Sequence, residues 1–462
     1  MKIKMISRNP DDYMRETKFD VHKIPRNYNP SEHPFQTERE YIRALNATKL
    51  DRIFAKPFIT NLSGHCDGVY RMCKHPSSLT TIISGSGDGE IIFWNLATRQ
   101  KLRMIQAHNG MVNGMSCSLN GQIVTTAGAD GTLKHWKLYN ADMDCSGKTP
   151  NEVNLRADEG EQPLFMATTK MPITSVHHQQ TKVNAGYFAA ASGHLVEIWD
   201  VNRAQPMNTF KWEVSQQHHV KFNSTETNLL ASLDWDHNIL LYDIRKNHPI
   251  KKMKMRMSCN SLSWNPMEAY IFTVANEDYN LYTFDLRKMD SALFVHRDHV
   301  LAVMDVDYSP TGQEFVSAGF DKIIRIYDKE KSSSREVYHT RRMQRLHCVQ
   351  WSLDDRYIIS GSDEMNLRLW KARASERLAI LRHKQRSSTE YQEKLRQKFQ
   401  HHPQIRRISR HRHVPKYVKF HANQFRMINA SHKKKEENRM LHSAPGTVER
   451  TSMKKKNILE ES

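Results

Sequence analysis

The stretch SGSGDGEIIFW, residues 84–94, decides the fold of this chain of 462 residues. A glycine-rich turn holding Asp88 leads into three apolar residues and then Trp94, which is the pattern of a tight turn followed by a buried strand. The order of an acid and, six residues later, an aromatic residue that ends a strand recurs along the chain. The aromatic residues are Trp94, Trp136, Trp199, Tyr242, Phe284, Tyr327 and Trp370. The residues six positions earlier are Asp88, Asp130, Gly193, Asp236, Asp278, Asp321 and Glu364.

The intervals between these aromatic residues are 42, 63, 43, 42, 43 and 43 residues. A period of about 40–45 residues with this punctuation predicts an all-β, seven-bladed WD-repeat β-propeller. We expect an extended and helical amino-terminal arm at 1–57, the propeller at 58–382, and a basic, partly helical carboxy-terminal extension at 383–462. Closure of the ring removes exposed sheet edges. We favour Phe58–Leu62 over Leu378–Leu381 as the closing strand.

Three blades carry a set of residue types that can hydrogen-bond in series: a histidine, a hydroxyl, an acid and an aromatic. A buried aspartate needs such donors. We expect the hydroxyl of Tyr327 to replace the indole N–H found in the other two sets. Because the sets recur at a fixed period, we interpret them as structural rather than catalytic. They are His65, Ser84, Asp88 and Trp94; His108, Thr126, Asp130 and Trp136; and His299, Ser317, Asp321 and Tyr327.

The 63-residue interval contains an acidic insertion, Tyr139–Gln162. A stretch of this length and composition predicts a mobile loop, which we assign to the third blade. Gly193 occupies the acidic position of that blade, so its hydrogen-bonding set is broken.

The formal net charge of +19 and the pI of about 9.5 favour polyanionic partners, whereas the mean hydropathy of −0.71 indicates solvated tails. None of the six cysteines forms a CxxC pair, so we expect reduced thiols and neither a metal site nor a cofactor. We expect no membrane span, no secretory signal and no enzymatic activity, because no long apolar run, signal segment or catalytic motif occurs.

Helices are predicted in the segments that precede and follow the propeller in the sequence. In the arm, Thr37 and Glu40 fit a capping box, followed by apolar residues at helical spacing up to Ile53. This helix either packs on the side of the propeller or docks the protein into a larger assembly. In the extension, Tyr391, Leu395 and Phe399 predict a helix that ends by Pro403, and Phe420, Phe425 and Ile428 predict another.

The carboxy-terminal extension is strongly basic. Residues 382–462 contain 21 Lys or Arg and 7 Asp or Glu, so this stretch accounts for most of the net charge. Three interpretations of the lysine triplets at 433–435 and 454–456 stay open: nuclear or nucleolar import signals, nonspecific RNA clamps, or solubilising charge. We expect the second triplet to lie in a disordered end.

An Arg-His stretch, residues 405–416, is the strongest candidate for binding nucleic acid or an acidic protein surface. Arginine forks match pairs of phosphate oxygens and can stack on bases. The alternative is a solvated face. The candidate RNA-binding residues are Arg406, Arg407, Arg410, His411, Arg412, His413 and Lys416.

Two blades end with an aromatic-Asp-x-Arg box. It resembles the WDxR box of substrate receptors of cullin-RING ubiquitin ligases, in which the arginine helps to dock the linker subunit. The alternative is ordinary blade chemistry, with each arginine paired to a neighbouring acid. The box residues are Asp243, Arg245, Asp285 and Arg287.

The chain as a whole resembles the SOF family of nucleolar WD-repeat proteins. The resemblance rests on residues 39–50 and 55–58 in the arm, 264–269 and 276–282 in the propeller, and 405–416 in the extension. It implies a structural component of the small-subunit processome, which contacts pre-rRNA, small nucleolar ribonucleoprotein and other processome proteins in the nucleolus. It also implies, as an alternative, a ligase substrate receptor that binds the linker subunit. A third, weaker interpretation is a chromatin or histone-tail reader. We expect no membrane partner and no small-molecule substrate.

Overall fold

The computed structural model describes residues 34–138, 162–180, 186–211, 215–246, 248–444, 447 and 452–461. The chain forms two compact units. The helical unit comprises Met1–Ala55 and Arg377–His411, and the propeller unit comprises Lys56–Glu376 and Arg412–Ser462. The predicted extended arm before Phe35 and the acidic insertion at 139–161 lie outside the described residues.

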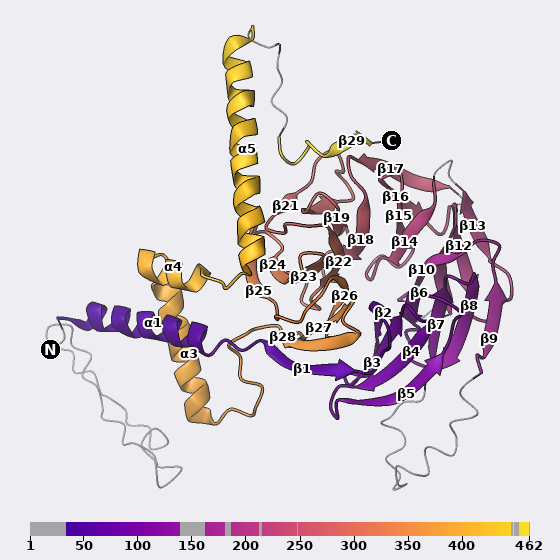
Figure 1. Cartoon of the computed structure of the whole chain (residues 1–462), viewed down its shortest axis with the longest axis horizontal. Coiled ribbons are helices and arrows are strands. Elements are labelled where there is room, and N and C mark those ends of the chain that lie inside the picture. Colours follow the sequence, from indigo (N-terminus) through magenta and orange to yellow (C-terminus); the bar gives the residue numbers. More distant parts are fainter. Residues whose placement is uncertain are drawn as a thin grey trace, which may run out of the picture. The chain divides into compact units, whose positions relative to one another are not determined.

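The propeller unit contains seven antiparallel sheets arranged around an axis (Figure 1). Each blade has four main strands, which run from the axis outward in sequence order except in blade seven, whose outer strand is β1; blade four gains a fifth strand, described below. Blade one has β2 (Val69–Lys74), β3 (Thr81–Ser86), β4 (Glu90–Asn95) and β5 (Gln100–Gln106). Blade two has β6 (Val112–Cys117), β7 (Ile123–Gly128), β8 (Thr132–Lys137) and β9 (Phe165–Thr168). Blade three has β10 (Ile173–His178), β11 (Tyr187–Ser192), β12 (Leu195–Asp200) and β13 (Asn208–Lys211). Blade four has β14 (Gln217–Phe222), β15 (Leu229–Asp234), β16 (Asn238–Asp243) and β17 (Pro249–Met255). Blade five has β18 (Cys259–Trp264), β19 (Ile271–Asn276), β20 (Leu281–Asp285) and β21 (Phe294–His296). Blade six has β22 (Val303–Tyr308), β23 (Glu314–Gly319), β24 (Ile324–Asp328) and β25 (Ser334–Tyr338). Blade seven has β26 (Leu346–Trp351), β27 (Tyr357–Ser362), β28 (Asn366–Lys371) and β1 (Phe58–Ser63).

Strand β1 closes the ring, as the sequence predicted. It pairs antiparallel with β28, so that the beginning of the propeller completes its last blade. The pairing shifts register once, between Phe58 and Thr60. Closure by β1 therefore supplies the fourth strand of blade seven from the beginning of the propeller and joins the two ends of the ring.

The core lies between neighbouring blades. One apolar cluster, for example, joins Ile83 and Phe93 of blade one to Val112, Val124 and Trp136 of blade two. The glycine-rich turn at residues 84–89 allows this close approach of the two blades. Gly89 has φ +85°, and a Cβ there would lie 2.0 Å from the carbonyl oxygen of His108. The repeat therefore buries its aromatic residues in interfaces between blades.

The acidic insertion belongs to a different blade from the one predicted. It lies between β8 and β9, which are paired strands of blade two. The prediction of blade three was wrong because the sequence repeat is offset from the sheet. The aromatic residue ends the third strand of a blade, so the residues after it still belong to the same blade.

The helical unit is built from α1 (Gln36–Ile53), α3 (His383–Lys398) and α4 (Pro403–Arg410). Ala44 of α1, Leu395 of α3 and Ile405 of α4 form its buried centre. The predicted capping box is absent, because α1 begins at Gln36, one residue before the expected cap, and has no side-chain cap. The apolar side of α1 packs on α3 and α4, a partner that the sequence did not suggest.

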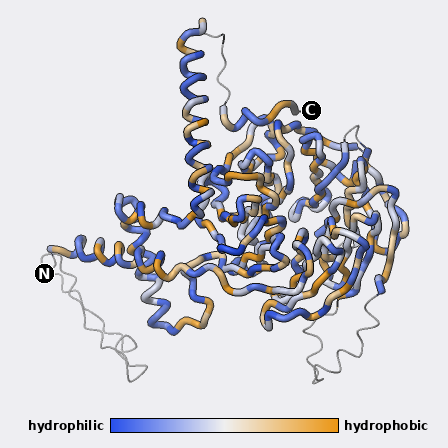
Figure 2. The backbone as a smooth tube through the Cα atoms, viewed as in Figure 1, coloured by the Kyte–Doolittle hydropathy of each residue, from blue (hydrophilic) through white to orange (hydrophobic). Residues whose placement is uncertain are grey.

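Two further elements of the extension belong to the propeller unit. Helix α5 (Lys416–His442) follows the Arg-His stretch, and β29 (Ile458–Glu461) pairs with β17 as a fifth strand of blade four. Figure 2 shows that α5 is mostly hydrophilic along its length. The prediction of a disordered end was wrong for the last triplet, Lys454–Lys456. The segment that follows this triplet is held by backbone pairing with β17.

The described cysteines are free thiols, four of them buried and Cys66 exposed. Burial raises the pKa of the Cys73 thiol to about 12, which keeps it protonated. No helix among the described residues is both long enough and apolar enough to cross a membrane.

Candidate nucleic-acid interface

Helix α4 separates apolar and basic side chains onto opposite faces. At 100° per residue, Arg406, Arg407 and Arg410 fall within one face, and Ile405 and Ile408 fall on the other. Ile405 is 2% exposed, whereas the three arginines are exposed. None of the ion pairs found among the described residues involves these arginines. Like charges at i,i+3 and i,i+4 repel one another, so this face is suited to a polyanion.

The rest of the helical unit holds α4 in place. Tyr41 of α1 donates its hydroxyl to Gln404 Oε1 at 2.6 Å and packs its ring against His402, with centroids 4.3 Å apart. Between α1 and α3, Arg396 pairs with Asp51 at 2.9 Å. The contacts on the apolar face leave the arginine face of α4 free of internal packing.

The remainder of the Arg-His stretch has a different role. We expected Arg412 to contact phosphate, but its guanidinium pairs with the buried carboxylate of Glu336 at 2.6 Å. Its Nε also donates to the carbonyl oxygen of Arg335 at 2.9 Å. A buried carboxylate requires such a partner, so Arg412 anchors the chain to blade six.

The other predicted residues of this stretch remain near the surface. His413 lies against His339, with a nitrogen–nitrogen distance of 3.1 Å. His411 is exposed at the end of α4, and Lys416 is exposed at the start of α5. The stretch is therefore divided between the two units, with Arg406–His411 in one and Arg412–Lys416 in the other.

Helix α5 is attached to the propeller through its first turns. Val418 is 1% exposed and packs with Val300 and Ile323, while Phe425 lies against Tyr279 with ring centroids 5.2 Å apart. Every residue from 426 to 439 is exposed, including the lysine triplet at 433–435. The docked end therefore supports a projecting basic half, visible as the long yellow helix in Figure 1.

The predicted hydrogen-bonding sets form to different extents. In blade two, His108 Nδ1 lies 3.2 Å from Asp130 Oδ1, and both His108 Nε2 and the indole N–H of Trp136 reach the Thr126 hydroxyl at 2.9 Å. Burial acts to raise the pKa of Asp130, but hydrogen bonds from Thr132 and Asn109 together with the neighbouring His108 outweigh it, so the net pKa is lowered. This set is complete, and its acid is held in the charged form.

Blade one lacks the acid. His65 lies 2.6 Å from Ser84, and Trp94 donates to Ser84 at 2.8 Å, but Asp88 is exposed. His65 Nδ1 is buried without a partner among the described residues. Blade two holds Asp130 with the hydroxyl of Thr132 at 2.7 Å, whereas the corresponding residue of blade one, Glu90, offers no such donor.

Blade six keeps the histidine, hydroxyl and acid but not the predicted aromatic contact. His299 lies 2.8 Å from Asp321 and 2.7 Å from Ser317. Tyr327 donates its hydroxyl to the carbonyl oxygen of Arg297 at 3.1 Å. The phenol oxygen lies at the far end of its ring, so it reaches past the serine to the backbone.

The two aromatic-Asp-x-Arg boxes lie in equivalent turns of neighbouring blades. The Arg245 side chain is 68% exposed and lies 3.4 Å from Asp243. In the second box, the backbone N–H of Arg287 donates to Asp285 at 3.0 Å, and its guanidinium lies over the Tyr270 ring, 4.0 Å from the centroid. Both arginines are exposed, which leaves them accessible to a partner.

Asn457 is a contact that the sequence did not reveal. Its side-chain amide donates to the Asp278 carboxylate and to the Tyr282 hydroxyl. Desolvation raises the pKa of the partly buried Asp278, so this donor stabilises an acid whose charged form is costly. The only signal in the sequence was the acid itself at a periodic position. Among the described residues, no group of His, Cys, Asp or Glu could hold a metal ion.

Comparison with known proteins agrees with both parts of the chain. Residues 372–458 match the Sof1-like domain, and residues 56–95, 99–137, 291–328 and 337–371 match the WD domain, G-beta repeat. The fold and these matches define a WD-repeat propeller protein that carries a Sof1-like domain.

Relatives match over nearly the full length. DDB1- and CUL4-associated factor 13 from Homo sapiens is 51% identical over 460 residues, covering 99% of each chain. The Xenopus tropicalis protein of the same name is 49% identical over 459 residues, again covering 99% of each chain. Protein SOF1 from Saccharomyces cerevisiae is 41% identical over 449 residues, covering 95% of this chain and 90% of the relative. The chain belongs to the family of these proteins.

Proposed function

We propose that this protein is a non-enzymatic scaffold of the nucleolar small-subunit processome that acts in small-subunit rRNA processing and contacts pre-rRNA through α4. The observation that carries the RNA contact is the face formed by Arg406, Arg407 and Arg410. These side chains are exposed on one side of a helix whose other side is buried. Membership of the SOF1 family supports the assignment to ribosome biogenesis.

The packing suggests separate roles for the propeller and the basic extension. The propeller offers a rigid platform for neighbouring proteins, because its blades share apolar interfaces. Arg412 fastens the extension to Glu336, and α5 presents a basic half beyond its docked turns. Positively charged helices that track a phosphate backbone bind with strong dependence on salt and little dependence on base sequence.

Crosslinking of the full-length protein to RNA in cells, followed by sequencing, tests this proposal. We expect enrichment of the small-subunit rRNA precursor, and loss of most of it when Arg406, Arg407 and Arg410 are changed to glutamine. If the crosslinked RNA does not include that precursor, the proposed role in the processome is refuted.

A second candidate function is that of a substrate receptor of a cullin-RING ligase. The names of the animal relatives associate those proteins with DDB1 and CUL4, and the exposed arginines of the two boxes could serve such docking. We expect Arg245→Ala combined with Arg287→Ala to abolish co-purification of DDB1 if the boxes dock it. Lys246→Ala, at the exposed residue beside the first box, is the matched control. If the folded double variant still co-purifies with DDB1, the two boxes are excluded as its docking site.

A further inference from the structure

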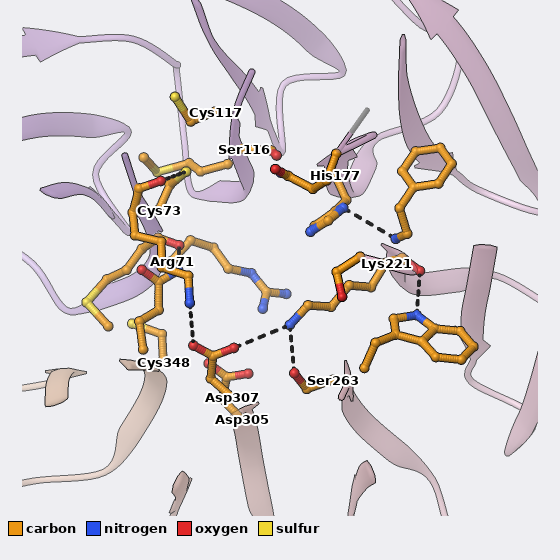
Figure 3. Close-up of a pocket in the computed structure, with 18 of the residues that line it drawn as sticks. Arg71, Cys73, Ser116, Cys117, His177, Lys221, Ser263, Asp305, Asp307 and Cys348 are labelled. Carbon is orange, nitrogen blue, oxygen red and sulfur yellow. Dashed lines mark hydrogen bonds and ion pairs between the residues drawn. The ribbon is translucent and has the colours of Figure 1, made fainter. Parts of the chain in front are cut away.

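A cavity of about 450 Å³ lies within the propeller and is lined by the innermost strands of the blades (Figure 3). Its lining also includes the second residue after each of these strands, in the turns toward the next strand. Proline or leucine occupies five of these seven positions, namely Pro76, Leu119, Pro266, Pro310 and Leu353. We call these five residues the apolar ring. It is a surface on which apolar parts of a ligand can rest.

The interior of the cavity is charged. Lys74 Nζ lies 3.0 Å from Asp307 Oδ2, and Lys221 Nζ lies 3.8 Å from Asp307 Oδ1. Asp305 accepts hydrogen bonds from the Ser261 hydroxyl at 2.8 Å and from the backbone N–H of Val349 at 2.9 Å. The two carboxylates are therefore supplied with donors from the protein itself.

Arg71 is the cation of the lining that forms no ion pair with either carboxylate among the described residues. Its Nε donates to the carbonyl oxygen of Asn113 at 2.7 Å, and no other hydrogen bond or ion pair of its guanidinium is found among the described residues. Figure 3 shows the guanidinium pointing into the cavity. With Lys74, Lys221, Asp305 and Asp307 counted, the lining carries one excess positive charge.

His219 also lines the cavity, but its Nδ1 atom is shielded from solvent and has no hydrogen-bond partner among the described residues. This atom therefore does not mark the place of a ligand. The excess positive charge at Arg71 is the observation that points to a negatively charged ligand group in this cavity.

We propose that the cavity receives an acidic side chain of a partner protein, carried on a segment whose flanking apolar or prolyl residues rest on the apolar ring. A carboxylate presents two oxygens to the guanidinium fork of Arg71 and matches the single excess charge. A free phosphate dianion would bring more negative charge near Asp305 and Asp307, and it would make no use of the ring. Met267, which follows Pro266, is 68% exposed and extends the apolar rim. This site goes beyond the proposed function, because it involves neither α4 nor the two arginine boxes.

Photo-crosslinking of the full chain in cells tests the proposal, with p-benzoylphenylalanine replacing Leu353 at the ring. We expect crosslinked segments of partner proteins that carry Asp or Glu within a few residues of the crosslink. Because a hydrogen bond to a charged group contributes about 1.5–3 kcal/mol, Arg71→Gln should lower the crosslinking yield about tenfold or more. Arg203→Gln, at an exposed arginine of blade three, should leave the yield unchanged.

Two further measurements keep the outcome decisive. A fluorescent peptide of the crosslinked segment should bind the purified protein, and its counterpart with glutamine in place of the acid should bind about tenfold more weakly. Thermal melting in inorganic phosphate against chloride of equal ionic strength shows whether a free anion fills the site. Three results would each overturn the proposal. The crosslinked segments could lack acidic residues, or the crosslinking yield could stay unchanged in an Arg71→Gln variant that melts normally. The third result is stabilisation by phosphate alone that depends on Arg71.

Discussion

Replacing the three arginines of α4 is the most direct perturbation of the proposed RNA contact. The variant R406Q/R407Q/R410Q removes three charges and leaves Ile405, the residue that packs in the helical unit, unchanged. Glutamine has a helix propensity close to that of arginine, so α4 should remain folded. The change is therefore confined to the exposed face.

The magnitude follows from counterion release. If each arginine neutralises one phosphate, the slope of log affinity against log salt should fall by about 0.7 per contact for single-stranded RNA and about 0.9 for a duplex. Three contacts correspond to about 2–3 units of slope. Between about 50 and 200 mM salt, the wild-type protein should then lose about 20–40-fold more affinity than the variant.

Fluorescence anisotropy with a labelled fragment of small-subunit rRNA precursor, titrated over a salt series, measures this slope. The matched control is R99Q/R203Q/R297Q, which removes the same total charge from exposed positions of the propeller. We expect the control to keep nearly the wild-type slope. Equal slopes for the wild type and the α4 variant, or an equal reduction in the control, would refute the assignment of the contact to α4.

Three further outcomes are expected. Burial lowers the pKa of His178 to about 3, so the unfolded chain takes up a proton below pH 6.5 that the folded chain excludes, and stability falls as the pH drops toward 3. The variant His178→Gln should bind about one proton fewer than the wild type on unfolding in acid. Its free energy of unfolding should therefore fall less steeply with decreasing pH, and an unchanged slope would contradict this. Leu395→Ala should destabilise the helical unit by about 2–5 kcal/mol, seen as loss of amide protection in α1 and α3 with β-strand protection unchanged. Asn457→Ala should cost about 1–3 kcal/mol by removing a donor from the partly buried Asp278, and it should expose residues 452–461 to protease. A wild-type cleavage pattern would contradict the role of Asn457 in holding this segment.

Features of the fold that depend on local or periodic patterns could be predicted from the sequence. The spacing of Trp94 and its six counterparts predicted the propeller, and the position of Phe58–Leu62 predicted its closing strand. The helical spacing of Leu395 and Phe399 likewise predicted α3. These features succeed because each depends on residues within one strand, turn or helix, or on a repeat that imposes the same pairing in every blade.

The candidate site was only partly readable. Composition pointed to the Arg-His stretch, but it could not separate the exposed Arg406 from Arg412, which is paired to Glu336. The two differ in partner rather than in local sequence. Asp88 and Asp130 likewise share a repeat position, yet only Asp130 reaches its histidine, because Thr132 holds it in place.

The sequence by itself determined that this protein is a propeller with a basic extension, because a period and a charge excess need no knowledge of contacts. Only the tertiary structure decided which residues of the extension are packed against the rest of the protein. Tyr41 meets Gln404 across 363 residues of chain, and Asn457 meets Asp278 across 179. Such contacts depend on how whole elements pack, so the tertiary structure alone divides the basic residues into those that anchor the chain and those that face solvent.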